Sequence, residues 1–435
     1  MSGRMPGSVP ETGYEASWYY HTARELRAHP PLAEHANADV CIIGAGYTGL
    51  SAAIELAERG FSVVVLEAHR VGAGASGRNG GVLSAGQRKD QDELERWLGN
   101  EVAARLWQIA LDANALIRER VARFRIDCDL ADGELIVAHK ARHVPSLWEY
   151  TSHLEKHYGY TDQQNLTTEA VRDMLGTNSY FGGYIDRRAG HLHPLNLALG
   201  EARAALDLGV RLHEQSRALS YREDSRGLHV RTATGEVSAR WLVLACNGYL
   251  GDLGRSFERY QMPINNFVVA TEPLGERRAR QINRDNVAVV DTRFVVNYFH
   301  NTPDHRLVFG GGETYSSRFP RDIKGFVRRR MLQVYPDLQD VAVEFGWGGT
   351  LAITLRRMPH FGRLSPHVYY AQGYSGHGVA MANMGGKLVA EAIAGQAERF
   401  DVFANLKHLP FPGGRLLRWP ALVAGMLYYS MLDRF

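Results

Sequence analysis

The sequence contains only three cysteines, Cys41, Cys128 and Cys246, and they lie far apart. An odd and widely spaced set supplies neither a disulfide framework nor the close cysteine pairs of a zinc site. Cys41 and Cys246 lie in apolar runs, where we expect them to be small buried side chains. His191 and His193 form a His-x-His pair, but no carboxylate or cysteine nearby completes a set of ligands. The sequence therefore predicts no disulfide and no metal ion.

The sequence also lacks a strong charge of either sign. Its 50 Lys and Arg residues stand against 47 Asp and Glu residues, which gives a formal net charge of +3. That charge is too small for a nucleic-acid partner unless the basic residues form a dense stripe. The densest basic run, Arg328–Arg330, is interpreted as a solvated helix face. We therefore expect no nucleic acid among the partners.

Long apolar segments are absent as well. The first 20 residues contain no apolar core of a secretory signal, which predicts a cytoplasmic protein. Residues 420–429 are apolar but too few to cross a membrane, because a spanning helix needs ~20 residues. We expect them to form a terminal helix that packs on the protein, with contact to a membrane surface or a partner as the alternative.

What the sequence does contain is an ordinary globular composition, with 45% hydrophobic and 22% charged residues. Its 435 residues exceed the roughly 250–300 that one core usually holds, which predicts more than one domain. Residues 1–37 are interpreted as an irregular arm held to the body by Trp18, Tyr19 and Tyr20. Apolar spacing predicts helices over residues 92–125, 194–208, 323–335 and 378–393. Apolar runs predict strands over residues 40–43, 61–66, 134–137, 211–221, 228–232, 241–246, 267–271, 287–290, 294–299, 307–310 and 367–374.

The motif Gly44-Ala45-Gly46-Tyr47-Thr48-Gly49 lies between a predicted strand and a predicted helix. A lone Gly-x-Gly-x-x-Gly occurs by chance, but this context is that of a dinucleotide-binding βαβ unit. The first glycine permits the tight turn, the second lets a pyrophosphate approach the backbone, and the third lets the helix lie close to the strand. The free N–H groups at the helix N-terminus favour phosphate groups.

Glu67 ends the second strand of this unit, about 20 residues after the first glycine. That is the usual place for a carboxylate that binds ribose hydroxyls. Because a carboxylate there repels a 2′-phosphate, the sequence disfavours NADP.

Two further glycine-rich loops favour FAD over NAD. The first spans residues 74–81, GASGRNGG, where an extended FAD needs backbone contact. The second spans residues 373–378, GYSGHG, between a predicted strand and a predicted helix. A helix N-terminus at that point stabilises the negative charge of reduced flavin near N1 and the C2 oxygen. A simple NAD dehydrogenase needs no such element.

These motifs resemble the D-amino-acid-oxidase superfamily, which includes glycine oxidase and sarcosine oxidase. Within it they are most similar to the gamma-glutamylputrescine oxidases and their relatives. The resemblance runs nearly end to end. It rests on AGYTGLSAA (45–53), GASGRNGG (74–81), GHLHPLNLALG (190–200), ACNGY (245–249), YFHNTPDHRLVFGGG (298–312), WGGT (347–350), MPHFGRL (358–364), YYAQGYSGHGVA (369–380) and FPGG (411–414).

The resemblance implies an α/β fold in which a Rossmann-type FAD-binding domain is interleaved with a mixed-sheet substrate domain. The implied segments are an N-terminal arm (1–37), an FAD-binding domain (38–127, 183–262 and 350–405), a substrate domain (128–182 and 263–349) and a C-terminal tail (406–435). The implied FAD contacts are Gly44, Ala45, Gly46, Tyr47, Thr48, Gly49, Glu67, Ala68, Ala75, Ser76, Gly77, Arg78, Asn79, Gly80, Gly81, Ala218, Asn247, Gly248, Gly373, Tyr374, Ser375, Gly376, His377, Gly378 and Val379.

For the chemistry, the resemblance implies hydride transfer from the carbon that bears an amine to flavin N5, followed by hydrolysis of the imine. Asn79 and His377 are the residues expected at the reacting end of the flavin. Tyr298, Trp347 and Arg306 are the candidate substrate contacts, because aromatic side chains can hold a cationic amine. Core packing of the two aromatics and a structural ion pair of Arg306 are the competing interpretations.

Substrate class depends on one position in the sequence. Amino-acid-oxidising relatives place an arginine upstream of the family's Pro-x-x-Gly, here Pro359 to Gly362. The matching position without gaps is Leu351, which cannot pair with a carboxylate. We therefore expect gamma-glutamylputrescine or a similar polyamine derivative, with oxygen or a quinone as electron acceptor. A small gap would bring Arg356 or Arg357 to that position and favour pipecolate, sarcosine or glycine; a non-catalytic flavin-binding protein is a third possibility.

Overall fold

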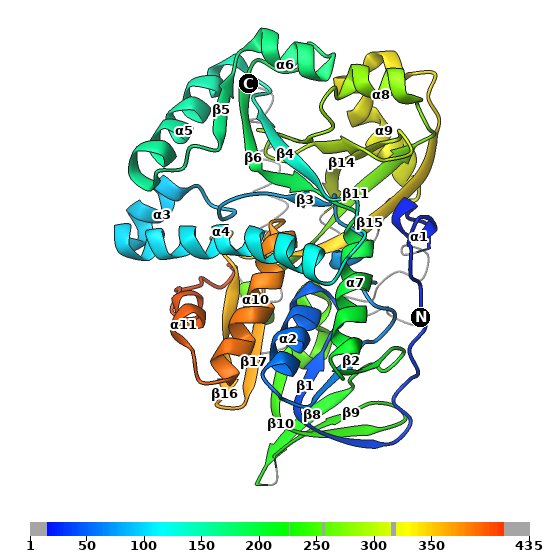
Figure 1. The fold of residues 1–435 in the computed structure, drawn as a ribbon, viewed down its shortest axis with the longest axis vertical. Helices are drawn as coiled ribbons and strands as arrows, with labels where there is room; N and C mark the ends of the chain where they lie inside the picture. Colours follow the sequence, from blue (N-terminus) through cyan, green and yellow to red (C-terminus); the bar gives the residue numbers. More distant parts are fainter. Residues whose placement is uncertain (1–14, 226, 255–256, 315–318, 413–435) are drawn as a thin grey trace.

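The computed structural model describes residues 15–225, 227–254, 257–314 and 319–412. Two large sheets form the body, one above the other in Figure 1. The long helix α4 (Asn100–Arg123) crosses between them.

The lower sheet has eight strands and is built around β1 (His35–Ile43). Its side chains alternate: Val40 and Ile42 face one core, and Cys41 and Ile43 face another. Because both faces are covered, the strand is an uninterrupted apolar run. The other strands are β2 (Val63–Leu66), β7 (Arg211–His213), β8 (Ser220–Asp224), β9 (Gly227–Arg231), β10 (Glu236–Leu244), β16 (His360–Ser365) and β17 (Val368–Gln372). β2, β7, β10 and β17 continue β1 in parallel, whereas β8, β9 and β16 pair antiparallel.

Four helices are tied together beside this sheet by a buried charge cluster. They are α2 (Tyr47–Glu58), α4, α7 (Pro194–Asp207) and α10 (Gly378–Ile393). Arg120 of α4 is 2% exposed and pairs with Glu55 of α2 at 3.0 Å and Glu201 of α7 at 3.5 Å. Lys387 of α10 reaches the same Glu55 at 3.0 Å. Since removing one partner would leave a buried charge unpaired, the cluster fixes which helices meet.

The upper sheet has nine strands and presents one face to the lower half of the molecule. Its outer face carries Leu135, Val137, Phe267 and Phe309, which pack with α6 (Thr168–Leu175), α8 (Glu276–Ile282) and α9 (Ile323–Val334). The strands are β3 (Val82–Leu83), β4 (Ala131–Val137), β5 (Gln163–Leu166), β6 (Gly183–His191), β11 (Met262–Thr271), β12 (Ala288–Asp291), β13 (Tyr298–Asn301), β14 (Leu307–Thr314) and β15 (Val343–Ile353). The remaining helices are α1 (Trp18–His21), α3 (Gln91–Leu98), α5 (Val144–Tyr158) and α11 (Glu398–Ala404).

Most predicted elements are confirmed, and three are corrected. The helix predicted over 92–125 is two helices, α3 and α4, because Gly99 between them has φ 83°, which a helix does not allow. The strand predicted over 211–221 is divided between β7 and β8. Phe294 precedes β13 instead of belonging to it.

The N-terminal arm is pinned by its aromatic residues, as predicted. Trp18 is 5% exposed and Tyr19 is fully buried. Tyr19 lies edge-on to Trp347 at 5.1 Å, and Trp18 contacts His193. The irregular part is shorter than expected, since β1 already begins at His35.

The upper sheet includes residues that the resemblance implied for the FAD-binding half: β3, β6, the first residue of β11 and the end of β15 from residue 350. The longest of these segments is strand β6, residues 183–191. The division into domains otherwise stays a prediction. Among the described residues no helix is long and apolar enough to cross a membrane, and the apolar residues 420–429 lie outside them.

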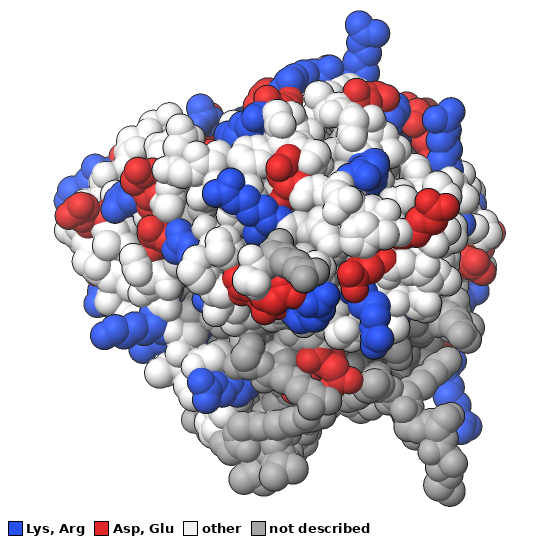
Figure 2. Space-filling view, turned by 90° about the horizontal axis from the view of Figure 1, so that it is seen from below, with Lys and Arg blue, Asp and Glu red and all other residues white. Residues whose placement is uncertain are grey.

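All three cysteines are free thiols. Among the described residues no three His, Cys, Asp or Glu side chains are placed to hold a metal ion. Figure 2 shows the molecule from below, where basic and acidic side chains are interspersed over the described part of that face.

Candidate active site

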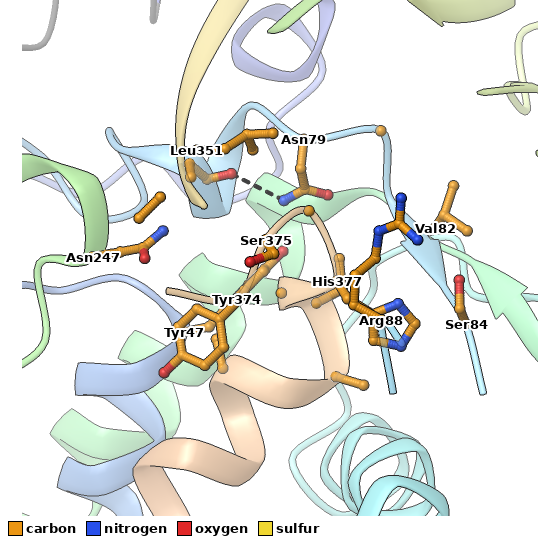
Figure 3. A pocket seen from close by; sticks show the side chains of 18 of the residues that line it. Tyr47, Asn79, Val82, Ser84, Arg88, Asn247, Leu351, Tyr374, Ser375 and His377 are labelled. Atoms are coloured by element: carbon orange, nitrogen blue, oxygen red, sulfur yellow. Dashed lines mark hydrogen bonds between the residues drawn. The ribbon is translucent and has the colours of Figure 1, made fainter. Parts of the chain in front are cut away.

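One cavity of about 810 Å³ extends between the two sheets. Its lower part is bounded by the three glycine-rich loops that the sequence singled out, and its upper part by the inner face of the upper sheet. Figure 3 shows side chains from these segments converging on it: Tyr47, Asn79, Val82, Ser84, Arg88, Asn247, Leu351, Tyr374, Ser375 and His377. Segments far apart in the sequence therefore share one site.

The first loop, between β1 and α2, depends on its glycines. Gly44 has a backbone φ of +109°, which residues other than glycine rarely adopt. A Cβ on Gly49 would lie 1.9 Å from the Gly44 carbonyl oxygen, so only glycine lets α2 approach β1 this closely. A Cβ on Gly46 would lie 2.7 Å from Ser76 Oγ and would fill the cradle at the start of α2. The cradle is thus shaped for a group that approaches the bare backbone.

The N-terminus of α2 faces this cradle and has no capping side chain of its own. Gly46 caps the helix without a side-chain hydrogen bond, and the Tyr47 N–H donates to Ser76 Oγ at 3.0 Å. Hydroxyl and N–H groups at a helix N-terminus suit phosphate oxygens. A pyrophosphate therefore fits the residues present.

Glu67 lies at the edge of the same cradle, at the end of β2. Its carboxylate accepts the Ala45 N–H and the His69 N–H, each at 2.9 Å. Burial raises the pKa of Glu67, and the backbone N–H groups oppose that shift. Ala68 and Ala218 line the cavity as well, whereas Asn247 Oδ1 accepts the Gly373 N–H of the third loop at 2.9 Å. This end has the carboxylate and the small side chains that an adenosine needs.

Asn79 in the second loop lines the cavity and also has a structural task. Its Nδ2 donates to the Ala75 and Ser76 carbonyls at 3.1 and 2.8 Å, and its Oδ1 accepts the Gly81 N–H at 2.8 Å. Its side chain lines the cavity, but these bonds occupy its amide. Asn79 therefore holds the loop in shape, and its place at the reacting end of the flavin stays a prediction.

The third loop places His377 in front of α10. Its Nε2 lies 2.9 Å from the Gly86 carbonyl oxygen, which can only accept, so Nε2 carries the proton. Burial, and secondly the charge of Arg88, lowers the pKa of His377 to about 4. His377 is therefore neutral near pH 7, with Nδ1 as an acceptor. The N-terminus of α10 beside it supplies the partial positive charge expected near the flavin pyrimidine.

The structure brings Tyr298 to the cavity but not Trp347 or Arg306. The Tyr298 ring lies against Gly80 and Gly310, where a Cβ would approach it to 2.2 and 2.0 Å. Trp347 is fully buried behind the wall and donates Nε1–H to the Arg78 carbonyl at 3.0 Å.

Arg306 is engaged elsewhere, in ion pairs with Asp304 and Glu344. Neither Arg306 nor Trp347 lines the cavity, and the structure favours the competing interpretations, an ion pair for Arg306 and core packing for Trp347. Five predicted FAD contacts also lie outside the cavity wall and shape its loops from behind: Gly49, Gly77, Gly81, Gly248 and Gly373.

Leu351 lines the cavity, and so does one of the two arginines that a gap in the alignment would bring to its position. That arginine is Arg357, whose guanidinium lies 5.9 Å from the ring centre of Phe294. Arg356 is directed elsewhere, over the Trp97 ring at 4.3 Å. The residue that favours an amine substrate, Leu351, and the one that favours an amino acid, Arg357, thus both line the cavity.

The sequence analysis missed a group of acidic and aromatic side chains in the upper part of the cavity. Glu134 and Asp186, from β4 and β6, line it together with Trp107, Tyr150 and Tyr184. A charged residue at an inward position of an apolar strand could have indicated Glu134. Its position beside Asp186 depends on strand pairing, which the sequence does not show.

Comparison with known proteins assigns the chain to a family. A family model described as FAD dependent oxidoreductase matches residues 39–392. The chain belongs to this family, it is an enzyme of the kind that acts on CH–NH bonds, and FAD is its cofactor.

Its relatives include a gamma-glutamylputrescine oxidoreductase of Escherichia coli, 42% identical over 97% of this chain and 99% of that one. A probable oxidoreductase OrdL of Haemophilus influenzae is 39% identical over 96% of this chain and 97% of its own length. Among solved structures, glycine oxidase from Geobacillus kaustophilus superposes with a TM-score of 0.73 at 22% identity, covering 86% of this chain and all of that one. The last likeness shows the fold, with its two mixed sheets, and confirms the fold class.

Proposed function

We propose that the protein oxidises the terminal amine of gamma-glutamylputrescine or a similar polyamine derivative. The observation that carries the proposal is one continuous cavity, which is lined both by the three glycine-rich loops and by Leu351. A leucine offers no partner to a carboxylate on the carbon being oxidised, and burying such a carboxylate unpaired is costly. The name of the 42% identical relative points to the same substrate.

The chain's own residues prepare the reaction. FAD, when bound, supplies the hydride acceptor at N5. We propose that the loops around Gly46, Asn79 and His377 hold it, with Glu67 at its ribose. His377 stays neutral and keeps its ring fixed by the Gly86 carbonyl. Tyr298 and Leu351 shape the space beside the reacting carbon. After oxidation the imine hydrolyses to an aldehyde, and oxygen or a quinone takes up the electrons.

A second candidate is the oxidation of a cyclic or N-substituted amino acid. Arg357 favours it, because this guanidinium lines the cavity and could fork onto a carboxylate.

Anaerobic mixing with a panel of substrates separates the two. We expect gamma-glutamylputrescine to bleach the flavin spectrum and to yield an aldehyde, with kcat/KM at least about tenfold above that of pipecolate, sarcosine and glycine, or ~1.4 kcal/mol of transition-state preference. If kcat/KM for an amino acid exceeds that for gamma-glutamylputrescine by that factor, the second candidate replaces the first. Arg357 then becomes the first residue to mutate.

A further inference from the structure

The upper part of the cavity contains a group of side chains that FAD does not account for. We call it the acidic chamber: Trp107, Glu134, Tyr150, Tyr184 and Asp186. They come from α4, β4, α5 and β6. Glu134 is 4% exposed and Asp186 is 1% exposed, so both carboxyl groups are largely removed from water.

The two acids are direct neighbours across strands. Glu134 of β4 pairs with Asp186 of β6 in the antiparallel register. Like charges at such a pair destabilise a sheet, unless a proton or a cation compensates them. Among the described residues no Lys, Arg or His forms an ion pair with either one. The compensation must therefore come from a proton or from a ligand.

Their hydrogen bonds distinguish the two acids. Asp186 accepts from the Tyr160 hydroxyl at 3.0 Å, from Gln163 Nε2 at 3.2 Å and from two backbone N–H groups. Glu134 accepts one bond, from Ser84 Oγ at 2.7 Å. Asp186 is thus held by the protein, whereas Glu134 keeps acceptor capacity toward the cavity.

Tyr184 provides an independent observation. Its side chain is 8% exposed and lines the cavity, and its hydroxyl forms no hydrogen bond with any described residue. The side chain is more than nine-tenths buried and its only open side is the cavity, so a ligand or water there is the partner left to this hydroxyl. The hydroxyl and Glu134 bound the same chamber.

The chamber adjoins the reacting end of the FAD site. Ser84, which holds Glu134, directly follows β3 and the glycine-rich loop at residues 74–81. Two residues further on, the Gly86 carbonyl accepts from His377 of the third loop. One short segment therefore contacts both Glu134 and the loop expected at the flavin. Figure 3 shows Ser84 and His377 on the same side of the cavity.

We propose that Glu134, assisted by the Tyr184 hydroxyl, binds the protonated nitrogen of the amine that is oxidised and so selects cationic amines at this site. The aromatic rings of Trp107 and Tyr150 add a surface that favours ammonium groups. The inference rests on the proposed function for the presence of an amine substrate. It adds the residue that recognises the charge.

A binding experiment on the oxidised holoenzyme tests this without turnover. The probe is a gamma-glutamyl diamine with two methyl groups on the carbon next to the terminal amine, which leaves no hydrogen to transfer. Its partner probe carries a hydroxyl in place of that amine. We expect Glu134→Gln, which can still accept from Ser84, to weaken the amine probe at least about tenfold and to leave the hydroxyl probe unchanged. Tyr184→Phe should weaken the amine probe a few-fold.

Glu93→Gln is the matched control, because Glu93 also borders the cavity but is already paired with Lys89. It should change neither affinity by more than about twofold. Flavin content and circular dichroism show whether each variant folds. An amine probe that binds Glu134→Gln as tightly as the natural protein overturns the inference, and so does an equal loss of both probes.

The pH dependence gives a second readout. Burial, and secondly the charge of Asp186, raises the pKa of Glu134 to about 8. Ser84 opposes this shift by donating to the carboxylate, and Tyr184, which itself lies near Tyr150 and Asp90, is the other titratable group that interacts with Glu134. Below about pH 8 the ammonium must displace the carboxyl proton, so its affinity should rise with pH up to that value. In Glu134→Gln the affinity for the amine probe should no longer rise with pH. If it still rises, the proton that the ammonium displaces belongs to another group, which contradicts the inference.

The two proposals can fail separately. If an amino acid proves the better substrate while Glu134→Gln still loses the amine probe, the substrate proposal fails and the ammonium site stands. If gamma-glutamylputrescine is oxidised while Glu134→Gln keeps full affinity, the ammonium site fails and the substrate proposal stands.

Discussion

The two ends of the cavity are built on different principles. The end proposed for the dinucleotide consists largely of backbone, with glycines at Gly44, Gly46 and Gly49 and a single carboxylate, Glu67. The acidic chamber consists of side chains from four separate elements. The proposed nucleotide contacts therefore lie in contiguous stretches of sequence. The proposed substrate contacts come from distant parts of the sequence and meet only when the strands pair.

The strongest way to break the dinucleotide end is Gly49→Ala. Its Cβ would lie 1.9 Å from the Gly44 carbonyl oxygen, and backbone atoms cannot move aside cheaply. We expect nearly complete loss of bound FAD, measured as the flavin-to-protein ratio after gel filtration. Gly60→Ala in the same βαβ unit is the control, because its Cβ meets no atom within 4 Å. It should cost about 1 kcal/mol of stability through its φ of +84° and keep its FAD; equal losses in both variants would contradict the argument.

A smaller effect at the same end is expected for Glu67→Ala. We expect FAD affinity to fall by roughly 1.5–3 kcal/mol, the scale of a hydrogen bond to a charged group. The change also removes the acceptor for the Ala45 and His69 N–H groups, so part of the loss comes from the loop itself. Titration of the apoprotein with FAD measures it. Unchanged affinity would mean that this carboxylate does not contact the ribose.

The smallest effect is expected for Arg306, and it tests whether this residue belongs to the substrate end of the cavity. Arg306 lies outside the cavity wall, in ion pairs with Asp304 and Glu344 whose carboxylates are half-exposed. We expect Arg306→Ala to lower the free energy of unfolding by about 1 kcal/mol or less and to leave KM for the amine unchanged. Urea denaturation and steady-state kinetics test this. A large rise in KM with unchanged stability would return Arg306 to the substrate site.

The sequence predicts what is local. The three glycine loops, helix α10 and the strand before Gly44 could be recognised because each signal occupies one short stretch. The hydrogen bonds that Asn79 and Trp347 donate to backbone carbonyls could not be predicted, because each joins side chain and backbone through the folded loop. Glu134 was missed for the complementary reason: only the pairing of β4 with β6 places it beside Asp186.

The central claim, oxidation of a neutral amine by bound FAD, is tested most directly by the pH dependence of anaerobic flavin reduction. Free amines are protonated near neutrality, and a bound ammonium must lose its proton before hydride can leave its carbon. His377, with a pKa lowered to about 4, does not titrate in the relevant range. In stopped-flow experiments with gamma-glutamylputrescine we therefore expect the reduction rate to rise between roughly pH 6 and roughly pH 10. A rate that stays flat across this range would contradict amine oxidation.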